Sequence, residues 1–148
     1  MYEKILLAAD GSRESKLAAR EVNKFVQMGV AKKVMILYVV QEHIEIYDNM
    51  AVSIDIWYKE AMALGKSVLG ETRDLVGAQA ECEEKLLIGN PARLICEEAE
   101  KLEVDMIAMG SRGKNPLSGL FLGSVSTRVL QCAPCPVFIV KNNHNFPE

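Results

Sequence analysis

The run Val34-Met35-Ile36-Leu37-Tyr38-Val39-Val40 is the longest uninterrupted apolar stretch of the chain. Residues 5–9, 106–109 and 137–140 are also apolar at consecutive positions. Strands of this kind are apolar on both faces, which is typical of a parallel sheet covered by helices on each side. Residues 81–88 differ because they carry four charges, and this favours a strand at an exposed edge of the sheet.

Helical patterns separate these strands. We expect helices over about residues 12–29, 53–76, 90–102 and 123–132, with capping residues at Ser12, Gly29 and Asn90. Trp57, Ala61 and Leu64 lie on the apolar stripe of the second helix and are predicted to face the core. The alternation of strand and helix predicts a single α/β domain over residues 1–148, a three-layer sandwich with a five-stranded parallel sheet between helices.

The composition is that of a globular protein. Of the 148 residues, 49% are hydrophobic and 25% are charged, which excludes disordered and fibrous chains. The formal charge of −3 argues against a nucleic-acid partner. No apolar run approaches the roughly 20 residues of a membrane-spanning helix, and the N-terminal run reaches Asp10 too soon for a signal peptide. We therefore expect a cytoplasmic protein with neither a membrane nor a nucleic-acid partner.

The chain contains four cysteines, Cys82, Cys96, Cys132 and Cys135. In the cytoplasm they are expected to be reduced thiols that pack as small hydrophobic residues. Cys132 and Cys135 have the CxxC spacing of redox proteins. However, a helix precedes this pair and a strand follows it, which is the reverse of the thioredoxin arrangement, so we do not expect redox chemistry. The two histidines are isolated in the sequence, and no metal site is predicted.

Glycine and serine residues follow the fourth predicted strand, where ligands bind in open α/β sheets. Gly110 and Gly113 permit backbone conformations in which successive N–H groups point into one concavity. Gly123 and Ser124 stand at a helix N-terminus, which favours an anion. Arg112 adds a positive charge, and residues 106–147 contain no Asp or Glu. The pattern predicts a phosphate site, although each glycine taken alone is more simply explained by a tight turn.

The spacing Gly110-x2-Gly113-x9-Gly123-Ser124 resembles the ATP-binding signature of the universal stress protein family, G-x2-G-x9-G-[ST]. The resemblance extends over nearly the whole chain. It implies an adenine nucleotide alpha hydrolase-like fold with the sheet order 3-2-1-4-5. It also implies ATP as the ligand, with ADP or AMP as alternatives and Mg²⁺ as a companion of the nucleotide.

The resemblance further implies a role for individual residues. Asp10 is expected near the ribose or a phosphate-bound Mg²⁺, and Val39 and Met109 against the adenine. The phosphates are expected at Gly110, Gly113, Gly123, Ser124 and Val125. Arg112 joins this set on the ground of its charge alone.

The same residues predict binding with slow or no hydrolysis, in a module that serves a stress response. Rapid turnover needs a positioned water and an orienting group, whereas Asp10 is the only acid at the candidate strand ends. An alternative is a protein-interaction module in which the nucleotide site is vestigial. This alternative rests on the last strand, Val137, Phe138, Ile139 and Val140, which has no charge to protect its edge and is expected to pair in a homodimer.

Overall fold

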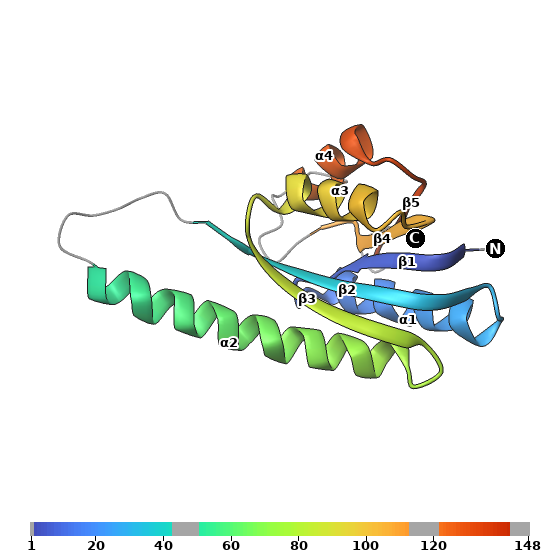
Figure 1. The fold of residues 1–148 in the computed structure, drawn as a ribbon, viewed down its shortest axis with the longest axis horizontal. Helices are drawn as coiled ribbons and strands as arrows, with labels where there is room; N and C mark the ends of the chain where they lie inside the picture. Colours follow the sequence, from blue (N-terminus) through green and yellow to red (C-terminus); the bar gives the residue numbers. More distant parts are fainter. Residues whose placement is uncertain (1, 43–50, 113–121, 143–148) are drawn as a thin grey trace, which may run out of the picture.

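The computed structural model describes residues 2–42, 51–112 and 122–142. Figure 1 shows one twisted sheet, with α1 and α2 on one face and α3 and α4 on the other. The elements are β1 (Tyr2–Ala8), α1 (Arg13–Gln27), β2 (Ala31–Gln41), α2 (Ala51–Val76), β3 (Glu81–Gly89), α3 (Pro91–Lys101), β4 (Met106–Gly110), α4 (Ser124–Cys132) and β5 (Val137–Val140). This confirms the predicted α/β sandwich.

The sheet has the order β3-β2-β1-β4-β5, and its paired strands are all parallel. The order implied by the family resemblance is therefore confirmed. β1 and β4 are neighbours in the sheet, with Leu6 opposite Ile107. The winding direction reverses between these two strands, so their carboxyl ends form the place where such sheets bind ligands.

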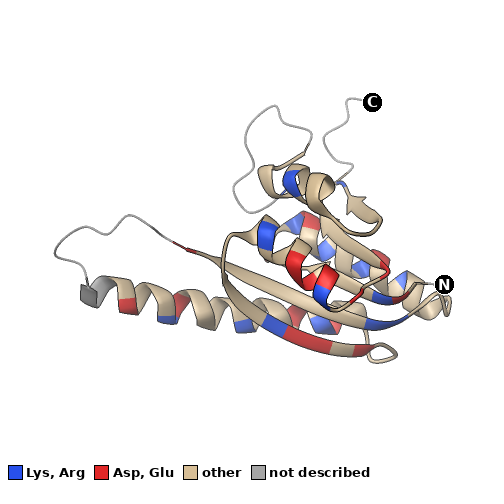
Figure 2. Cartoon of the chain, turned by 45° about the horizontal axis from the view of Figure 1, so that its top comes forward, with Lys and Arg blue, Asp and Glu red and all other residues tan. Residues whose placement is uncertain are grey.

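The two edges of the sheet differ in charge. β3 forms one edge, as its charged sequence predicts, and Figure 2 shows Glu and Lys positions along it. β5 forms the other edge and contains only Val, Phe and Ile. Charge protects the first edge from pairing with other strands, whereas nothing in the sequence of β5 protects the second.

The core consists of two apolar layers, one on each face of the sheet. Leu7 is fully buried in the layer beneath α1 and α2, and its neighbour Leu6 is fully buried in the layer beneath α3 and α4. Successive residues of a strand point to opposite faces. The central strands must therefore be apolar at every position, which explains the uninterrupted run in β2.

The predicted helix ends are confirmed. The Ser12 side chain accepts a hydrogen bond from the Ser15 N–H, and the Asn90 side chain accepts one from the Arg93 N–H. Gly29 has a φ of +72° after the end of α1, a conformation that glycine adopts readily. Within the described ranges, no helix is both long enough and apolar enough to span a membrane.

The expectation of four reduced cysteines is wrong, because Cys96 and Cys132 form a disulfide. Cys96 lies in α3 and Cys132 is the last residue of α4, and their Cα atoms are 6.1 Å apart although 36 positions separate them in the sequence. Cys82 and Cys135 are free. The bond depends on how α3 packs against α4, which the CxxC spacing of Cys132 and Cys135 does not reveal.

Two glycines within α2 provide a matched pair for a stability measurement. A Cβ on Gly65 would lie 2.7 Å from side-chain carbons of Tyr38 and Leu86, whereas a Cβ on Gly70 would meet nothing within 4 Å. We expect Gly70→Ala to raise the free energy of unfolding by about 1 kcal/mol, because alanine is the better helix former. Gly65→Ala should instead lower it by about 1–2 kcal/mol through overpacking. Urea unfolding of both variants measures the difference, and equal shifts would contradict this packing.

Candidate functional site

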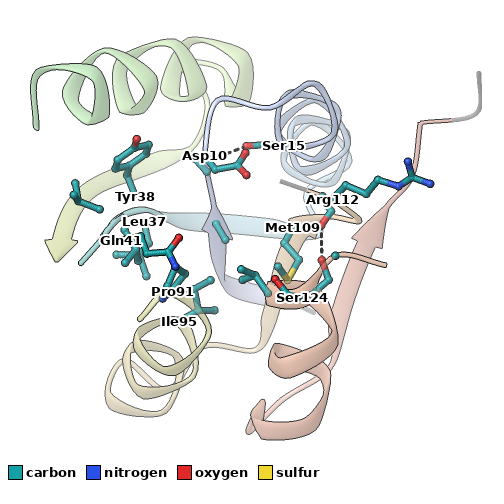
Figure 3. Close-up of a pocket in the computed structure, with 18 of the residues that line it drawn as sticks. Asp10, Ser15, Leu37, Tyr38, Gln41, Pro91, Ile95, Met109, Arg112 and Ser124 are labelled. Atoms are coloured by element: carbon teal, nitrogen blue, oxygen red, sulfur yellow. Dashed lines mark hydrogen bonds between the residues drawn. The ribbon is translucent and has the colours of Figure 1, made fainter. Parts of the chain in front are cut away.

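A cavity of about 560 Å³ opens at the carboxyl ends of β1, β2 and β4 (Figure 3). This volume lies within the roughly 300–1,000 Å³ range of small-molecule sites. The predicted residues that line it are Asp10, Val39, Met109, Gly110, Arg112, Gly123, Ser124 and Val125. Gly113 lies outside the described residues. The fold therefore brings eight of the nine predicted site residues to one cavity.

Asp10 is held in place by the start of α1. The Ser12 N–H donates a hydrogen bond to Asp10 Oδ1 at 2.9 Å, and the Asp10 N–H donates to Ser15 Oγ at 3.2 Å. Such local bonds fix the carboxylate where β1 turns into the helix. Asp10 therefore presents a positioned negative charge at the carboxyl end of β1, between the ends of β2 and β4.

Tyr38 is a cavity residue that the sequence analysis did not identify. Burial raises the pKa of its phenol, and the negative charge of Asp10 raises the pKa further. The phenol is therefore protonated at neutral pH and can donate a hydrogen bond, and Tyr38 is among the residues that line the cavity. Its position depends on Gly65, whose missing side chain lets α2 approach the Tyr38 ring closely.

The N-terminus of α4 faces the cavity without a side-chain cap. Its N-cap is Gly123, which makes no side-chain hydrogen bond, and its first turn has no acidic residue. α1 and α3, in contrast, are capped by Ser12 and Asn90. The first N–H groups of a helix have no partner within it. The amides of Ser124 and Val125 can therefore donate to an anion, where the helix dipole favours negative charge.

Three hydrogen bonds fix the start of α4 on the end of β4. The Gly123 N–H donates to the Ser111 carbonyl at 2.7 Å. The buried Ser126 hydroxyl lies 3.0 Å from the Gly110 carbonyl and 3.2 Å from the Ser111 carbonyl. The free amides of α4 thus have a defined position relative to the sheet, which a binding site requires.

Gly110 has a different role from the one that the sequence analysis gave it. A Cβ on Gly110 would lie 2.7 Å from the backbone carbon of Glu14, so this glycine admits the start of α1 rather than a phosphate. Gly123 has a φ of −70°, and Gly110 is not among the glycines with positive φ. The amide donors at the cavity come from the helix start, where the sequence analysis placed Gly123, whereas Gly110 does not adopt the left-handed conformation that was expected for it.

An apolar slot forms another part of the cavity. Val39 and Met109 are among its lining residues, together with Pro91 and Ile95 from the first turns of α3. Met109 is 5% exposed and belongs to the core layer beneath α3 and α4. A slot with apolar walls suits a flat, uncharged ring.

Arg112 contributes its backbone to the cavity rather than its charge. Its carbonyl accepts a hydrogen bond from the Ser12 hydroxyl at 3.4 Å. Figure 3 shows its guanidinium extending away from the cavity. The charge for which Arg112 was included is therefore not directed at the cavity in this structure, although the residue is among those that line it.

α2 supplies a wall that the sequence analysis assigned to the core. Trp57, Glu60, Ala61 and Leu64 line the cavity, and Leu64 is 46% exposed. The N-terminal part of α2 extends beyond the sheet in Figure 1 and therefore passes the open edge. The length of α2 could have indicated this arrangement. The helix has 26 residues, whereas β4 has only five, so part of the helix must extend past the sheet.

Comparisons with known proteins give a consistent result. The profile of the universal stress protein family matches residues 1–141. A universal stress protein of Thermus aquaticus is 34% identical over 145 residues, which cover 95% of this chain and 100% of the relative. The solved structure of universal stress protein UspA from Lactobacillus plantarum has a TM-score of 0.84 at 23% identity, covering 94% of this chain and 97% of that chain. The universal stress protein from Archaeoglobus fulgidus in complex with dAMP has a TM-score of 0.69 at 22% identity, covering 95% and 98%.

Proposed function

The chain belongs to the universal stress protein family, and we propose that it binds an adenine nucleotide, ATP above all, in the cavity at the carboxyl edge of the sheet. The observation that carries this proposal is the uncapped start of α4, which faces the cavity that also contains an apolar slot. These two parts of the cavity have the chemistry of the two ends of a nucleotide. An anion suits the helix N-terminus, and an aromatic base suits the slot.

In this proposal the adenine lies between Val39 and Met109, and the phosphates accept hydrogen bonds from the amides of Ser124 and Val125. Asp10 binds the ribose hydroxyls or a Mg²⁺ ion carried by the phosphates. Within the described part of the chain, no three His, Cys, Asp or Glu residues group to hold a metal ion. A single carboxylate agrees with Mg²⁺, which usually enters such sites with the nucleotide and keeps several waters.

The relatives support the choice of an adenine nucleotide in a limited way. The Archaeoglobus fulgidus protein was solved with dAMP, but at 22% identity its likeness to this chain is one of fold. The spaced glycine signature and the cavity residues of this chain therefore carry the argument. ADP and AMP share the base and ribose contacts and lose only part of the phosphate contacts.

We further propose that ATP is held as a signal, with slow or no hydrolysis, in a cytoplasmic regulatory module of the stress response. The first turn of α4, where the phosphates would lie, brings no acidic side chain. The described carboxylates on the cavity wall are Asp10, assigned to the ribose or the metal, and Glu60 on α2. Fast hydrolysis needs a group that orients the attacking water at the terminal phosphate. A cytoplasmic location follows from the proposed ligand, since ATP is held inside the cell.

The proposal is tested on the purified protein. Mass spectrometry of the small molecules released on denaturation should identify an adenine nucleotide. Calorimetric titration of the emptied protein should then give tighter binding for ATP than for GTP. Turnover should stay far below about 1 per second, the low end of ordinary enzymes. Failure of ATP to bind would refute the proposal, and rapid turnover would refute its signalling part.

β5 favours a second proposal, a homodimer formed by pairing of this strand with its twofold mate. The Ile107 N–H donates to the carbonyl of Pro136, which directly precedes β5, and the Ser111 N–H donates to the Val140 carbonyl, so these two carbonyls face β4. Since groups alternate along a strand, the amide groups of Val137 and Ile139 face the free edge. An uncharged edge with free backbone groups is a template for pairing. Dimerisation does not require nucleotide, so an interaction module with a vestigial nucleotide site remains the alternative function.

Light scattering at micromolar concentration tests the dimer. The expected mass is twice the 16.4 kDa of the chain. Ile139→Pro removes an outward N–H and should shift the protein towards monomer while leaving the α4 start unchanged. A monomeric wild-type protein at this concentration would contradict the proposed interface.

A further inference from the structure

The Cys96–Cys132 disulfide joins the two helices that form one side of the cavity. Cys96 directly follows Ile95, which lines the apolar slot. Cys132 ends α4, whose first residue Ser124 lies at the proposed phosphate position. α4 has nine residues and is therefore about 13 Å long. The disulfide therefore links α3, which lines the apolar slot, to α4, whose first amides are assigned to the phosphates.

The bond is accessible to small molecules from the surface. Cys132 is exposed, while Cys96 is 8% exposed. A second hollow of about 390 Å³ lies over the pair, between α3 and α4, and its charged lining residues are Arg93, Arg128, Glu97 and Glu100. Arg93 is paired with Glu97 at 3.0 Å. A small thiol or disulfide can therefore reach the exposed Cys132 sulfur through this hollow.

The remaining two thiols are poor competitors for exchange. Burial raises the pKa of both Cys82 and Cys135. Both side chains are only partly buried, but the thiolate is the attacking form, so a raised pKa makes each thiol less reactive. Cys135 shares the CxxC spacing with Cys132, yet Cys132 is bonded to Cys96. Exchange should therefore proceed through Cys132 with Cys96 as its partner.

We propose that Cys96 and Cys132 form a reversible thiol–disulfide switch, driven by the glutathione couple, that sets the affinity of the cavity for nucleotide. The switch rests on the proposed function, since its readout is nucleotide binding. Disulfides of cytosolic proteins are usually transient and redox-sensing. The family signature and the proposed nucleotide contacts do not involve either cysteine.

Oxidation consists of two exchange steps. The Cys132 thiolate attacks one sulfur of glutathione disulfide, which breaks that S–S bond, forms a mixed disulfide and releases one glutathione thiolate. The Cys96 thiolate then attacks the Cys132 sulfur, forms the protein disulfide and releases the second glutathione thiolate. The two cysteine thiols lose two protons and two electrons, and glutathione disulfide becomes two glutathione thiols.

The oxidised form is expected to bind nucleotide more tightly. The Ser126 hydroxyl and the Gly123 N–H fix the N-terminal end of α4 on β4, and the disulfide fixes its C-terminal end on α3. Reduction removes the covalent part of the second attachment and leaves the packing of the fully buried Val129, so the first amides of this short helix should be less well ordered for the phosphates. Preorganisation improves affinity, and we expect the oxidised protein to bind ATP at least about fivefold more tightly, within the usual range of coupling between sites.

The experiment equilibrates the protein in glutathione buffers of increasing potential and measures free thiols and the ATP dissociation constant together. Free thiols should fall from four to two as ATP affinity rises. Cys132→Ser should keep the affinity of the reduced protein in every buffer. Cys135→Ser is the matched control, because it removes the other cysteine of the CxxC pair and should leave the switch intact.

The outcomes separate the switch from the proposed function. If thiols are lost while ATP affinity stays constant, the switch is overturned and nucleotide binding stands. The same holds if no thiols are lost, or if Cys135→Ser abolishes the response. If neither the oxidised nor the reduced protein binds ATP, both proposals fail. The wild-type thiol titration decides the matter even if a variant does not fold.

Discussion

Gly123→Asp is expected to weaken ATP binding at least about 100-fold, so that the dissociation constant rises by two or more factors of ten. Gly123 is the N-cap of α4 and has φ −70° and ψ 166°, almost the same conformation as the N-cap Ser12. An Asp in this conformation accepts hydrogen bonds from the N–H groups of the first turn. It would occupy the amides assigned to the phosphates and place a negative charge beside them.

The same substitution should stabilise the protein in the absence of nucleotide. An acidic N-cap in place of glycine improves a helix by a few tenths of a kcal/mol, and its charge interacts favourably with the dipole, by about 0.3–1 kcal/mol. Opposite changes in stability and affinity exclude misfolding as the cause of the loss. Thermal unfolding without ligand and calorimetric titration with ATP measure the two effects.

Gly123→Asn is the matched control for charge. Asn is also a favourable N-cap and nearly the same size as Asp, but it is neutral. It should reduce ATP affinity by a smaller factor than Asp, and the difference isolates the repulsion between carboxylate and phosphate. Equal affinities of the wild type and the Asp variant would mean that the phosphates lie elsewhere.

Gly110→Ala is expected to lower the free energy of unfolding by about 2–3 kcal/mol, the upper part of the range for overpacking. The new Cβ would lie 2.7 Å from the Glu14 backbone carbon and 2.8 Å from the Ser15 nitrogen. These are backbone atoms at the start of α1, so relief requires the whole helix to move away from β4. Because the Asp10 N–H is bonded to Ser15, the movement should also reduce ATP affinity.

Equilibrium unfolding in urea measures the effect of Gly110→Ala. Gly70→Ala is the appropriate reference, because the same chemical change there meets open space. An unchanged unfolding midpoint for Gly110→Ala would contradict the close contact between β4 and α1.

Most of the fold can be predicted from the sequence, because the buried strands of a parallel sheet appear as runs of consecutive apolar residues. Leu6 and Leu7 must both be apolar since each faces a different layer, and the charges of β3 identify an edge strand. The caps Ser12 and Asn90 are equally local. The order of the strands is not local information, and it came from the resemblance of the glycine signature to a known family.

The features that the sequence did not predict depend on packing between distant elements. Cys96 and Cys132 meet only because α3 lies against α4. Gly110 looks like part of a phosphate loop until the Glu14 backbone is placed beside it. Trp57 packs against the core as its spacing predicts, but its place on the cavity wall depends on the extension of α2 past the sheet. Each case is a contact between elements whose separation in the sequence carries no sign of their proximity.

The most direct measurement is a crystal structure of the protein with ATP. The account predicts phosphate oxygens within hydrogen-bond distance of the Ser124 and Val125 amides, and the adenine ring between Val39 and Met109. Electron density for ATP at any other surface, with the start of α4 left free of phosphate, would contradict it.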